Sequence, residues 1–324
     1  MSNFRIAVIG ADQLDPDHHI ALNTLSERGL VSAFALDASA SDQGFESLRK
    51  AMQNNDLDAI MIAGPRSDLR PWAVFALQNG WPVYSTYAVP ATIEDMVEIR
   101  RAEQSGSKSV IQFGLTGRHH ESVQTAKSKA ETGEYGRLLT ARGVCGCADD
   151  GIQDGVIFDP GPQLFDLIHL FAGPFQDVTG YSDLDRTSEP GSETNVFATL
   201  RTHSGTLASL HISASQWRPT FRLELGFERG YMWLEGLNTQ QHNFGQEVLV
   251  YGRTDGNVAM HETVDRFEQS NGAKFALEAF LNRLRDPSEP AIGTSQDAFD
   301  VLNTIQRVLA ADPVFAPAEE RHVS

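Results

Sequence analysis

Short apolar runs alternate with amphipathic segments along the first third of the chain. The runs at 6–9 and 59–62 are apolar throughout, which is typical of strands buried on both faces of a sheet. Ile93, Met96 and Val97 instead recur at helical spacing behind Thr92, a residue type that favours the N-cap. This alternation predicts a parallel sheet that is covered on both faces by helices. The predicted strands are 6–9, 33–36, 59–62, 83–84 and 110–113, and the predicted helices are 18–28, 44–54, 68–79 and 93–105.

The pattern changes after about residue 120, where strand-like segments separated by turn residues predominate. His203, Ser204 and Gly205 are expected to join two of these strands as a short hairpin. Runs of strands with few helices predict an α+β domain built on one open antiparallel sheet. If helices cover one face, the other face is left to solvent or to a partner. The predicted strands are 138–144, 178–182, 194–201, 206–213, 221–227, 231–235 and 247–252, and the predicted helices are 121–132, 162–172, 273–285 and 296–311.

Charge is distributed unevenly between these two patterns. Residues 1–119 contain 10 Lys and Arg against 14 Asp and Glu, whereas residues 120–324 contain 16 against 29. The two parts therefore contribute −4 and −13 to the net charge of −17. We expect two domains: an α/β Rossmann domain at 1–119 and an α+β domain at 120–324.

Composition narrows the class of protein. A net charge of −17 disfavours nucleic acid and anionic membranes as partners, because both require basic patches. The sequence contains no run of 18 apolar residues, and its first residues do not resemble a signal peptide, so we expect a cytoplasmic protein. Cys145 and Cys147 alternate along a predicted strand, but two thiols without further ligands make a poor metal site. No metal is expected.

Six segments, taken in order, resemble the Gfo/Idh/MocA family of oxidoreductases. The last of them resembles the family's substrate-site motif, G-G-x-x-x-D-x-G-x-H-x-x-D, with Asp159, Gly161 and Asp166 in register. Gln163 stands where the family has its histidine. The six segments are 4–10, 57–65, 73–80, 113–118, 132–136 and 155–173.

The resemblance implies that the first domain binds NAD(P). The implied cofactor residues are Gly10, Ala11, Asp12, Asp37, Gly64 and Pro65. Asp12 occupies the second glycine position of the phosphate loop, where a carboxylate about 4 Å from a phosphate would cost roughly 1 to 4 kcal/mol. A rearranged loop with Asp12 turned outward would avoid this cost. Asp37 matches the ribose-binding acid and favours NAD over NADP.

The resemblance also nominates catalytic and substrate-binding residues in both domains. Tyr87 occupies the place of the family's lysine and cannot supply its charge, although it can donate a proton or orient a hydroxyl. Gln163 can bind a substrate but does not titrate. Asp166, one helical turn further on, is the best remaining titratable candidate. Arg118, His119 and Asp159 are expected to contact a carbohydrate-like substrate.

Three functional interpretations stay open, and nothing in the sequence tests the third, a structural subunit in a hetero-complex with an active paralogue through the open sheet. The first is an NAD(P)-linked oxidoreductase that acts on a sugar, polyol or related carbonyl compound with atypical catalytic residues. The second is a cofactor-poor relative, serving as a binding or regulatory protein or as a non-redox carbohydrate-modifying enzyme. In the first two cases, homo-oligomerisation through the open sheet is a hypothesis.

Overall fold

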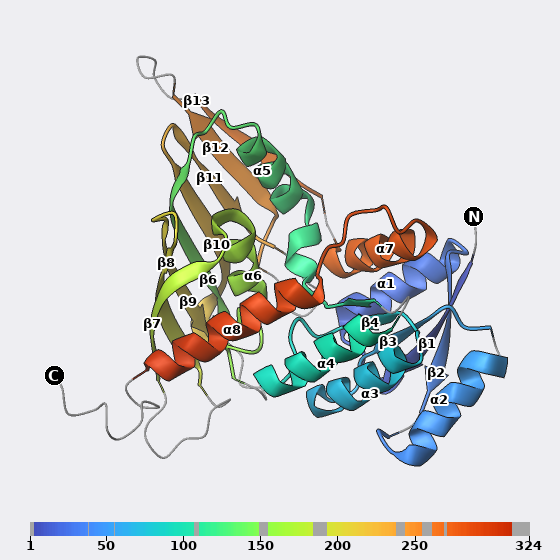
Figure 1. Ribbon diagram of the computed structural model, residues 1–324. Coiled ribbons are helices and arrows are strands. Elements are labelled where there is room, and N and C mark those ends of the chain that lie inside the picture. Colours follow the sequence, from blue (N-terminus) through green and yellow to red (C-terminus); the bar gives the residue numbers. More distant parts are fainter. Residues whose placement is uncertain are drawn as a thin grey trace, which may run out of the picture. The chain divides into compact units, whose positions relative to one another are not determined.

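The computed structural model describes residues 3–37, 39–54, 56–106, 110–148, 155–183, 193–237, 244–254, 261–268 and 271–312 (Figure 1). The chain forms two compact units. The first contains residues 1–116 and 271–302, and the second contains 117–270 and 303–324. Residues 271–302 therefore belong with the first unit, whereas the sequence pattern assigned them to the second domain. The apolar face of an amphipathic helix indicates that the helix packs against another part of the protein, but it does not indicate which part.

The first unit is a parallel α/β sheet with the strand order β2-β1-β3-β4-β5. This confirms the predicted Rossmann-type architecture, with connections that reverse direction between β1 and β3. At such a reversal the loops at the carboxyl ends of neighbouring strands diverge and leave room for a ligand. The elements are β1 (Phe4–Ile9), α1 (Pro16–Glu27), β2 (Val31–Leu36), α2 (Asp42–Asn54), β3 (Ala59–Ile62), α3 (Arg66–Gln78), β4 (Val83–Ser85), α4 (Ile93–Ser105) and β5 (Ile111–Gln112).

Helix α7 (Gly272–Arg285) completes the core of the first unit. Its residues Leu277 and Phe280 pack with Leu25 of α1 against Tyr84 of β4, whose ring centroid lies 5.6 Å from that of Phe280. Helices α1 and α7 cover one face of the sheet, and α3 and α4 lie on the other (Figure 1). Burial of this apolar surface is the main stabilising contribution to the unit.

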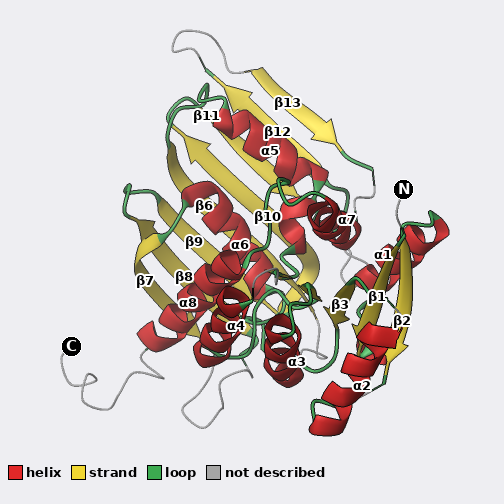
Figure 2. Ribbon diagram, turned by 45° about the vertical axis from the view of Figure 1, so that its right-hand side comes forward, coloured by secondary structure: helices red, strands yellow, loops and turns green. Residues whose placement is uncertain are grey.

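The second unit is an eight-stranded sheet with the order β13-β12-β11-β10-β6-β9-β8-β7 (Figure 2). All pairs are antiparallel except β6 and β9, which run parallel, so the sheet is mixed rather than purely antiparallel. The predicted hairpin at 203–205 is confirmed between β8 and β9. The elements are β6 (Leu138–Ala148), β7 (Phe175–Ser182), β8 (Asn195–Thr202), β9 (Leu207–Ser213), β10 (Ser215–Phe227), β11 (Gly230–Glu235), β12 (Val248–Arg253), β13 (His261–Arg266), α5 (Glu121–Glu131) and α6 (Gly161–Ala172).

Helices cover one face of this sheet. A Cβ on Gly143 of β6 would lie 2.7 Å from Leu164 Cδ1, so α6 sits directly on the strand where only glycine leaves room. Helix α8 (Ser295–Ala311) begins in the first unit, and its second half packs on β7, with Val308 against Gly180. The opposite face exposes large apolar side chains, including Phe197 and Leu207. Across the described ranges, no helix has the length and apolar character needed to span a bilayer.

Candidate active site

The loop after β1 lies at the carboxyl edge of the first sheet. Gly10 has a φ of 71°, and a Cβ there would lie 2.4 Å from Gly64 Cα, so the loops after β1 and β3 touch through their backbones. Ala11 and Asp12 follow in the short 3-10 helix η1 (Ala11–Gln13), where Asp12 is exposed. The tight turn is one that only glycine allows without strain.

The other candidate cofactor residues lie at the same edge. Asp37 directly follows β2 and is exposed. Gly64 and Pro65 separate β3 from α3, and Pro65 is the N-cap of that helix. Because β1, β2 and β3 are adjacent and parallel, their carboxyl ends bring these residues to one side of the unit.

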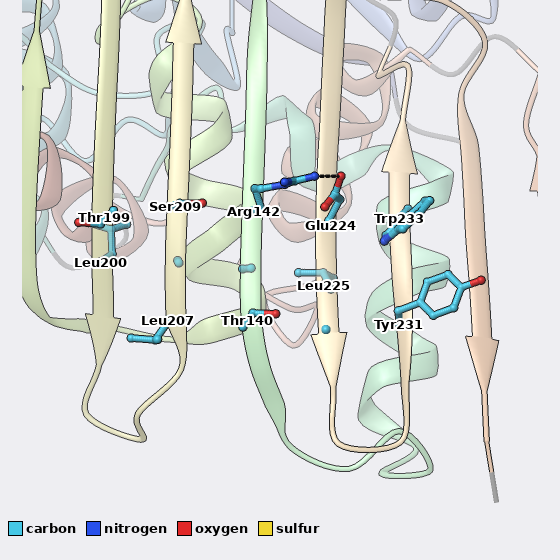
Figure 3. A pocket seen from close by; sticks show the side chains of 13 residues that line it. Thr140, Arg142, Thr199, Leu200, Leu207, Ser209, Glu224, Leu225, Tyr231 and Trp233 are labelled. Atoms are coloured by element: carbon cyan, nitrogen blue, oxygen red, sulfur yellow. Dashed lines mark hydrogen bonds and ion pairs between the residues drawn. The ribbon is translucent and has the colours of Figure 1, made fainter. Parts of the chain in front are cut away.

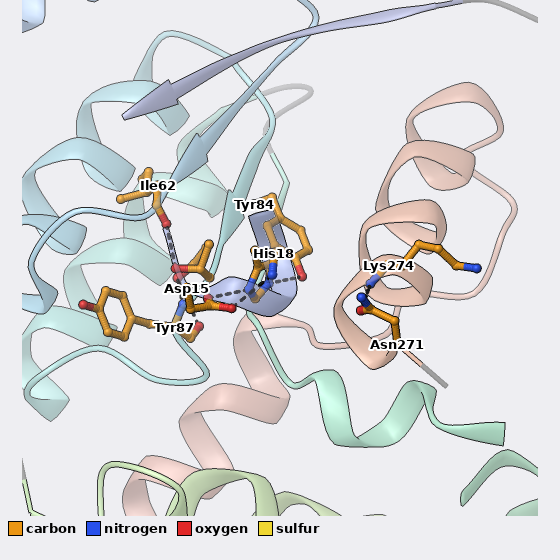
Figure 4. A network of polar contacts seen from close by, with 9 residues as sticks. Asp15, His18, Ile62, Tyr84, Tyr87, Asn271 and Lys274 are labelled. Atoms are coloured by element: carbon orange, nitrogen blue, oxygen red, sulfur yellow. Dashed lines mark hydrogen bonds and ion pairs between the residues drawn. The ribbon is translucent and has the colours of Figure 1, made fainter. Parts of the chain in front are cut away.

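Asp15 caps the N-terminus of α1, a role that the sequence analysis did not assign. Its Oδ1 accepts the backbone N–H of His18 at 3.0 Å, and its Oδ2 lies 2.6 Å from His18 Nδ1 (Figure 4). His18 Nε2 lies 3.0 Å from the hydroxyl of Tyr84. Burial pushes the pKa of Asp15 upward, but hydrogen bonds from the His18 ring and from the backbone of His18 and Asp17 outweigh it and hold the pKa below 3.8. Asp15 followed by Pro16 is the sequence signal that could have revealed this cap.

This cap bears on whether the loop fits a dinucleotide. In the fingerprint G-x-G-x-x-G counted from Gly10, Asp15 occupies the third glycine position. The pyrophosphate of a dinucleotide binds to N–H groups at the start of the following helix. Here Pro16 has no N–H, and the N–H groups of Asp17 and His18 hydrogen-bond the Asp15 carboxylate. The glycine turn and the exposed Asp37 fit such a ligand, whereas the phosphate donors are already engaged.

Tyr87 lies beyond β4 in the first unit. Its ring lies under the guanidinium of Arg66, with the Arg66 Cζ 4.8 Å from the ring centroid. Its carbonyl accepts hydrogen bonds from the Ser85 hydroxyl and the Gly114 N–H, each at 3.0 Å. The half-buried ring is thus held by its backbone on one side and a cation on the other.

In the second unit, α6 holds the short helix η2 (Thr116–His119) through two candidate residues. Gln163 Oε1 accepts the Gly117 N–H at 3.0 Å. Asp166 accepts Arg118 Nε at 2.6 Å and Arg118 Nη2 at 2.5 Å, a bidentate pair in which Asp166 is completely buried. Two of the three side chains that the resemblance nominates for chemistry, Gln163 and Asp166, are therefore bound to the backbone or side chain of η2.

The two histidines that follow Arg118 are buried. Burial, with the positive charge of Arg118 and then of His120, lowers the pKa of His119 from 6.5 to about 4. His120 Nδ1 lies 3.0 Å from Glu247 Oε2, and Glu247 Oε1 accepts the Ser122 N–H at 2.9 Å. Burial raises the pKa of Glu247, but its hydrogen bonds to His120 and Ser122 outweigh that effect and keep it below 4.5. Asp159, by contrast, is exposed just before α6.

A shallow hollow of about 550 Å³ lies on the face of the second sheet that α6 does not cover (Figure 3). Arg142 crosses its floor to Glu224, with Nη2 2.7 Å from Oε1. Leu207 and Trp233 form part of its wall, and both are more than one-third exposed. None of the nominated site residues lines this hollow.

Comparisons with known proteins bear on this arrangement. Residues 123–233 match the model of the GFO/IDH/MocA C-terminal domain. Inositol 2-dehydrogenase from Corynebacterium glutamicum is 24% identical over 284 residues, spanning 83% of this chain and 84% of that protein. The chain is therefore similar to Gfo/Idh/MocA proteins, and its residues 123–233 match the C-terminal domain of that family.

Solved structures share the fold of this chain along nearly its whole length. A levoglucosan dehydrogenase in complex with NADH and L-sorbose has a TM-score of 0.78 at 13% identity, covering 96% of this chain and 97% of that chain. A 3-ketoreductase from Actinomadura kijaniata, in complex with TDP-benzene and NADP, has a TM-score of 0.74 at 16% identity, covering 95% and 97%. The matched family domain contains Gln163, Asp166 and most of the second sheet.

The Arg118–Asp166 pair generates the first prediction. Asp166→Asn leaves the guanidinium of Arg118 buried without its charged partner, so we expect a loss of about 3–5 kcal/mol in the free energy of unfolding, measured by urea denaturation. The matched control is Asp177→Asn in the exposed Arg201–Asp177 pair, which should cost less than about 1 kcal/mol. Equal losses in the two variants would show that Asp166 has no structural role.

The lowered pKa of His119 predicts a pH-dependent stability. The unfolded state binds a proton near 6.5, whereas the folded state does so only near 4, so stability falls as the pH decreases between these values. Replacing His119 with Asn removes this contribution. Urea unfolding at pH 7 and pH 4.5 should show the wild type losing up to about 3 kcal/mol more than the variant. Parallel losses in both proteins would contradict the assignment of a neutral buried His119.

Proposed function

We propose that this chain is an NAD(P)-linked oxidoreductase that acts on a sugar, polyol or related carbonyl compound. The observation that supports this most is the loop pair at the carboxyl edge of the first sheet, where Gly10 touches Gly64 and Asp37 faces solvent. A relative with the activity of inositol 2-dehydrogenase, and neighbours bound to NADH or NADP, support the same class. When bound, the cofactor would supply or accept a hydride.

The side chain of Asp37 favours NAD over NADP. A carboxylate at the end of the second strand can hydrogen-bond a ribose 2′-hydroxyl and repels a 2′-phosphate. Gly10, Ala11, Gly64 and Pro65 provide backbone that a dinucleotide can approach closely. Asp12 is exposed, so solvent and salt screen part of its repulsion of a phosphate.

The roles of the catalytic candidates follow from their contacts. Tyr87, held under Arg66, donates its hydroxyl proton to a substrate oxygen or orients a substrate hydroxyl. Gln163 and Asp166 hold Gly117 and Arg118 in place, so they position η2. Arg118, His119 and Asp159 contact the substrate, and His119 does so as a neutral ring.

One observation favours the second interpretation, a cofactor-poor relative with a binding, regulatory or non-redox role. Asp15 occupies the N–H groups that a pyrophosphate would need, and Asp166 is tied to Arg118. A protein that no longer transfers hydride would be expected to lose both its phosphate-binding groups and its free titratable group. Affinity for the dinucleotide separates the two interpretations.

The test is calorimetric titration of the cofactor-stripped protein with NAD⁺, NADH and NADPH, followed by a dehydrogenase assay with inositols, hexoses and anhydrosugars. We expect tighter binding of NAD(H) than of NADPH. For the substrate that reacts, Tyr87→Phe should lower kcat by about 100-fold, because a positioned proton donor contributes that much. Tyr181→Phe, a change in the second unit at a 62% exposed ring, is the matched control. Absence of binding up to millimolar dinucleotide would reject the oxidoreductase function.

We further propose that two copies of the chain associate through the open face of the second sheet. That face carries Phe197, Leu207 and Trp233, and Phe197 stacks on His211 with ring centroids 3.9 Å apart. Large exposed apolar side chains on one face of a sheet usually mark an interaction surface. The hollow around Arg142 would receive side chains of the second copy.

Sedimentation analysis over a hundredfold range of concentration tests this assembly. Phe197→Glu buries a carboxylate in the proposed interface and should convert the dimer into a monomer. Ile20→Glu, at a similarly exposed apolar residue on α1, should leave the assembly unchanged. A monomeric wild type would reject the proposal.

A further inference from the structure

We infer that Asp15 is an internal competitor for the phosphate subsite: its carboxylate occupies the N-terminus of α1, and a dinucleotide must displace it to bind there. This inference rests on the proposed function, because it concerns how the same site is regulated. The proposed function concerns the cofactor, whereas this inference concerns a side chain of the protein itself.

The geometry of the cap resembles that of a bound anion. A helix N-terminus attracts anions through its free N–H groups and the positive end of its dipole. Asp15 supplies such an anion from within the chain, with Oδ1 3.0 Å from the His18 nitrogen. The backbone of Asp17 also donates to it, and Pro16 contributes no donor. No N–H of the first helical turn ahead of His19 remains for a second anion.

Hydrogen bonds link the three side chains of this network. A carboxylate whose pKa lies below its ordinary value only accepts hydrogen bonds, so His18 Nδ1 carries the proton that points to Asp15. His18 Nε2 forms the second hydrogen bond of the ring, with the hydroxyl of Tyr84. The network runs from Tyr84 through His18 to Asp15, and every member has a partner (Figure 4).

The network is anchored at its buried end and open at the other. Tyr84 is fully buried in the core between β4 and α7, and its edge contacts the ring of His18. The side chain of His18 is 4% exposed, whereas that of Asp15 is 32% exposed. A ligand can therefore reach and replace the carboxylate without disturbing the two rings that hold it.

Neighbouring negative charges should weaken the binding of a pyrophosphate at the start of α1 further. Asp12 and Asp17 lie within three residues of Asp15, and no Lys or Arg occurs between Arg5 and Arg28. A pyrophosphate that displaced Asp15 would therefore have three carboxylates near it in the sequence and no Lys or Arg from this segment to offset them. Replacing Asp15 should make the N–H donors available to a phosphate and also remove one negative charge. Replacing Asp12 should remove one negative charge only.

The experiment compares Asp15→Ser with Asp12→Ser. A serine at the N-cap can accept the His18 N–H in the free protein, so the helix keeps its cap, but its neutral hydroxyl is a weaker acceptor than a carboxylate and yields this N–H to a phosphate more readily. Asp12→Ser removes the same charge from the same loop at an exposed position and is the matched control. A third variant, Asp15→Asn, keeps a side chain in the subsite without its charge. The affinities for NAD⁺ and for ADP, which shares the pyrophosphate, are measured by calorimetry, and thermal melting checks folding.

We expect Asp15→Ser to bind NAD⁺ and ADP at least about tenfold more tightly than the wild type, and Asp15→Asn to lie between them. Asp12→Ser should change the affinity by less than about threefold. If NAD⁺ binds the wild type and Asp15→Ser equally well, the inference is wrong and the oxidoreductase function stands. If only Asp15→Ser binds, the inference holds and the function fails for the natural chain. If neither binds, both are wrong.

Discussion

The cost of burying a charge without a partner governs the polar interior of this protein. An isolated buried ion costs several kcal/mol, which is comparable to the stability of a whole domain. Asp166, Glu247 and Asp15 each avoid this cost by accepting hydrogen bonds from a segment they must hold in place. The start of α1, the segment around Arg118 and the start of α5 are consequently fixed by carboxylates rather than by apolar packing alone.

This constraint explains why residues nominated for chemistry have internal partners. Gln163 and Asp166 lie one helical turn apart on α6, and both face the segment that holds Gly117 and Arg118. The same pair of positions can serve catalysis in a protein whose neighbouring segment leaves them free. Similarity to the family therefore indicates the fold of this chain, whereas the contacts of individual side chains determine what it can do.

Most of the fold could be predicted from the sequence because periodicity records burial. Strand β3 is a continuous apolar run and β8 alternates between buried and exposed residues, so strands of both kinds were recognised by pattern. Strand β13 (His261–Arg266) was missed, since its residues are mostly exposed and leave no apolar pattern. The parallel pairing of β6 with β9 was missed because pairing depends on tertiary contacts that propensity does not encode. For the site, position along the chain indicated Gly10 and Asp37, but the 48-residue separation of Arg118 and Asp166 hid their contact.

The placement of α7 has a consequence for how the protein is made. The first sheet is complete in sequence by β5, yet part of its core, Leu277 and Phe280 against Tyr84, comes from residues translated after the whole second sheet. During synthesis the face of the first sheet that α1 and α7 share therefore remains only partly covered while about 160 further residues emerge from the ribosome. The amino-terminal unit cannot reach its native core co-translationally as an independent body, and its maturation is coupled to completion of the chain.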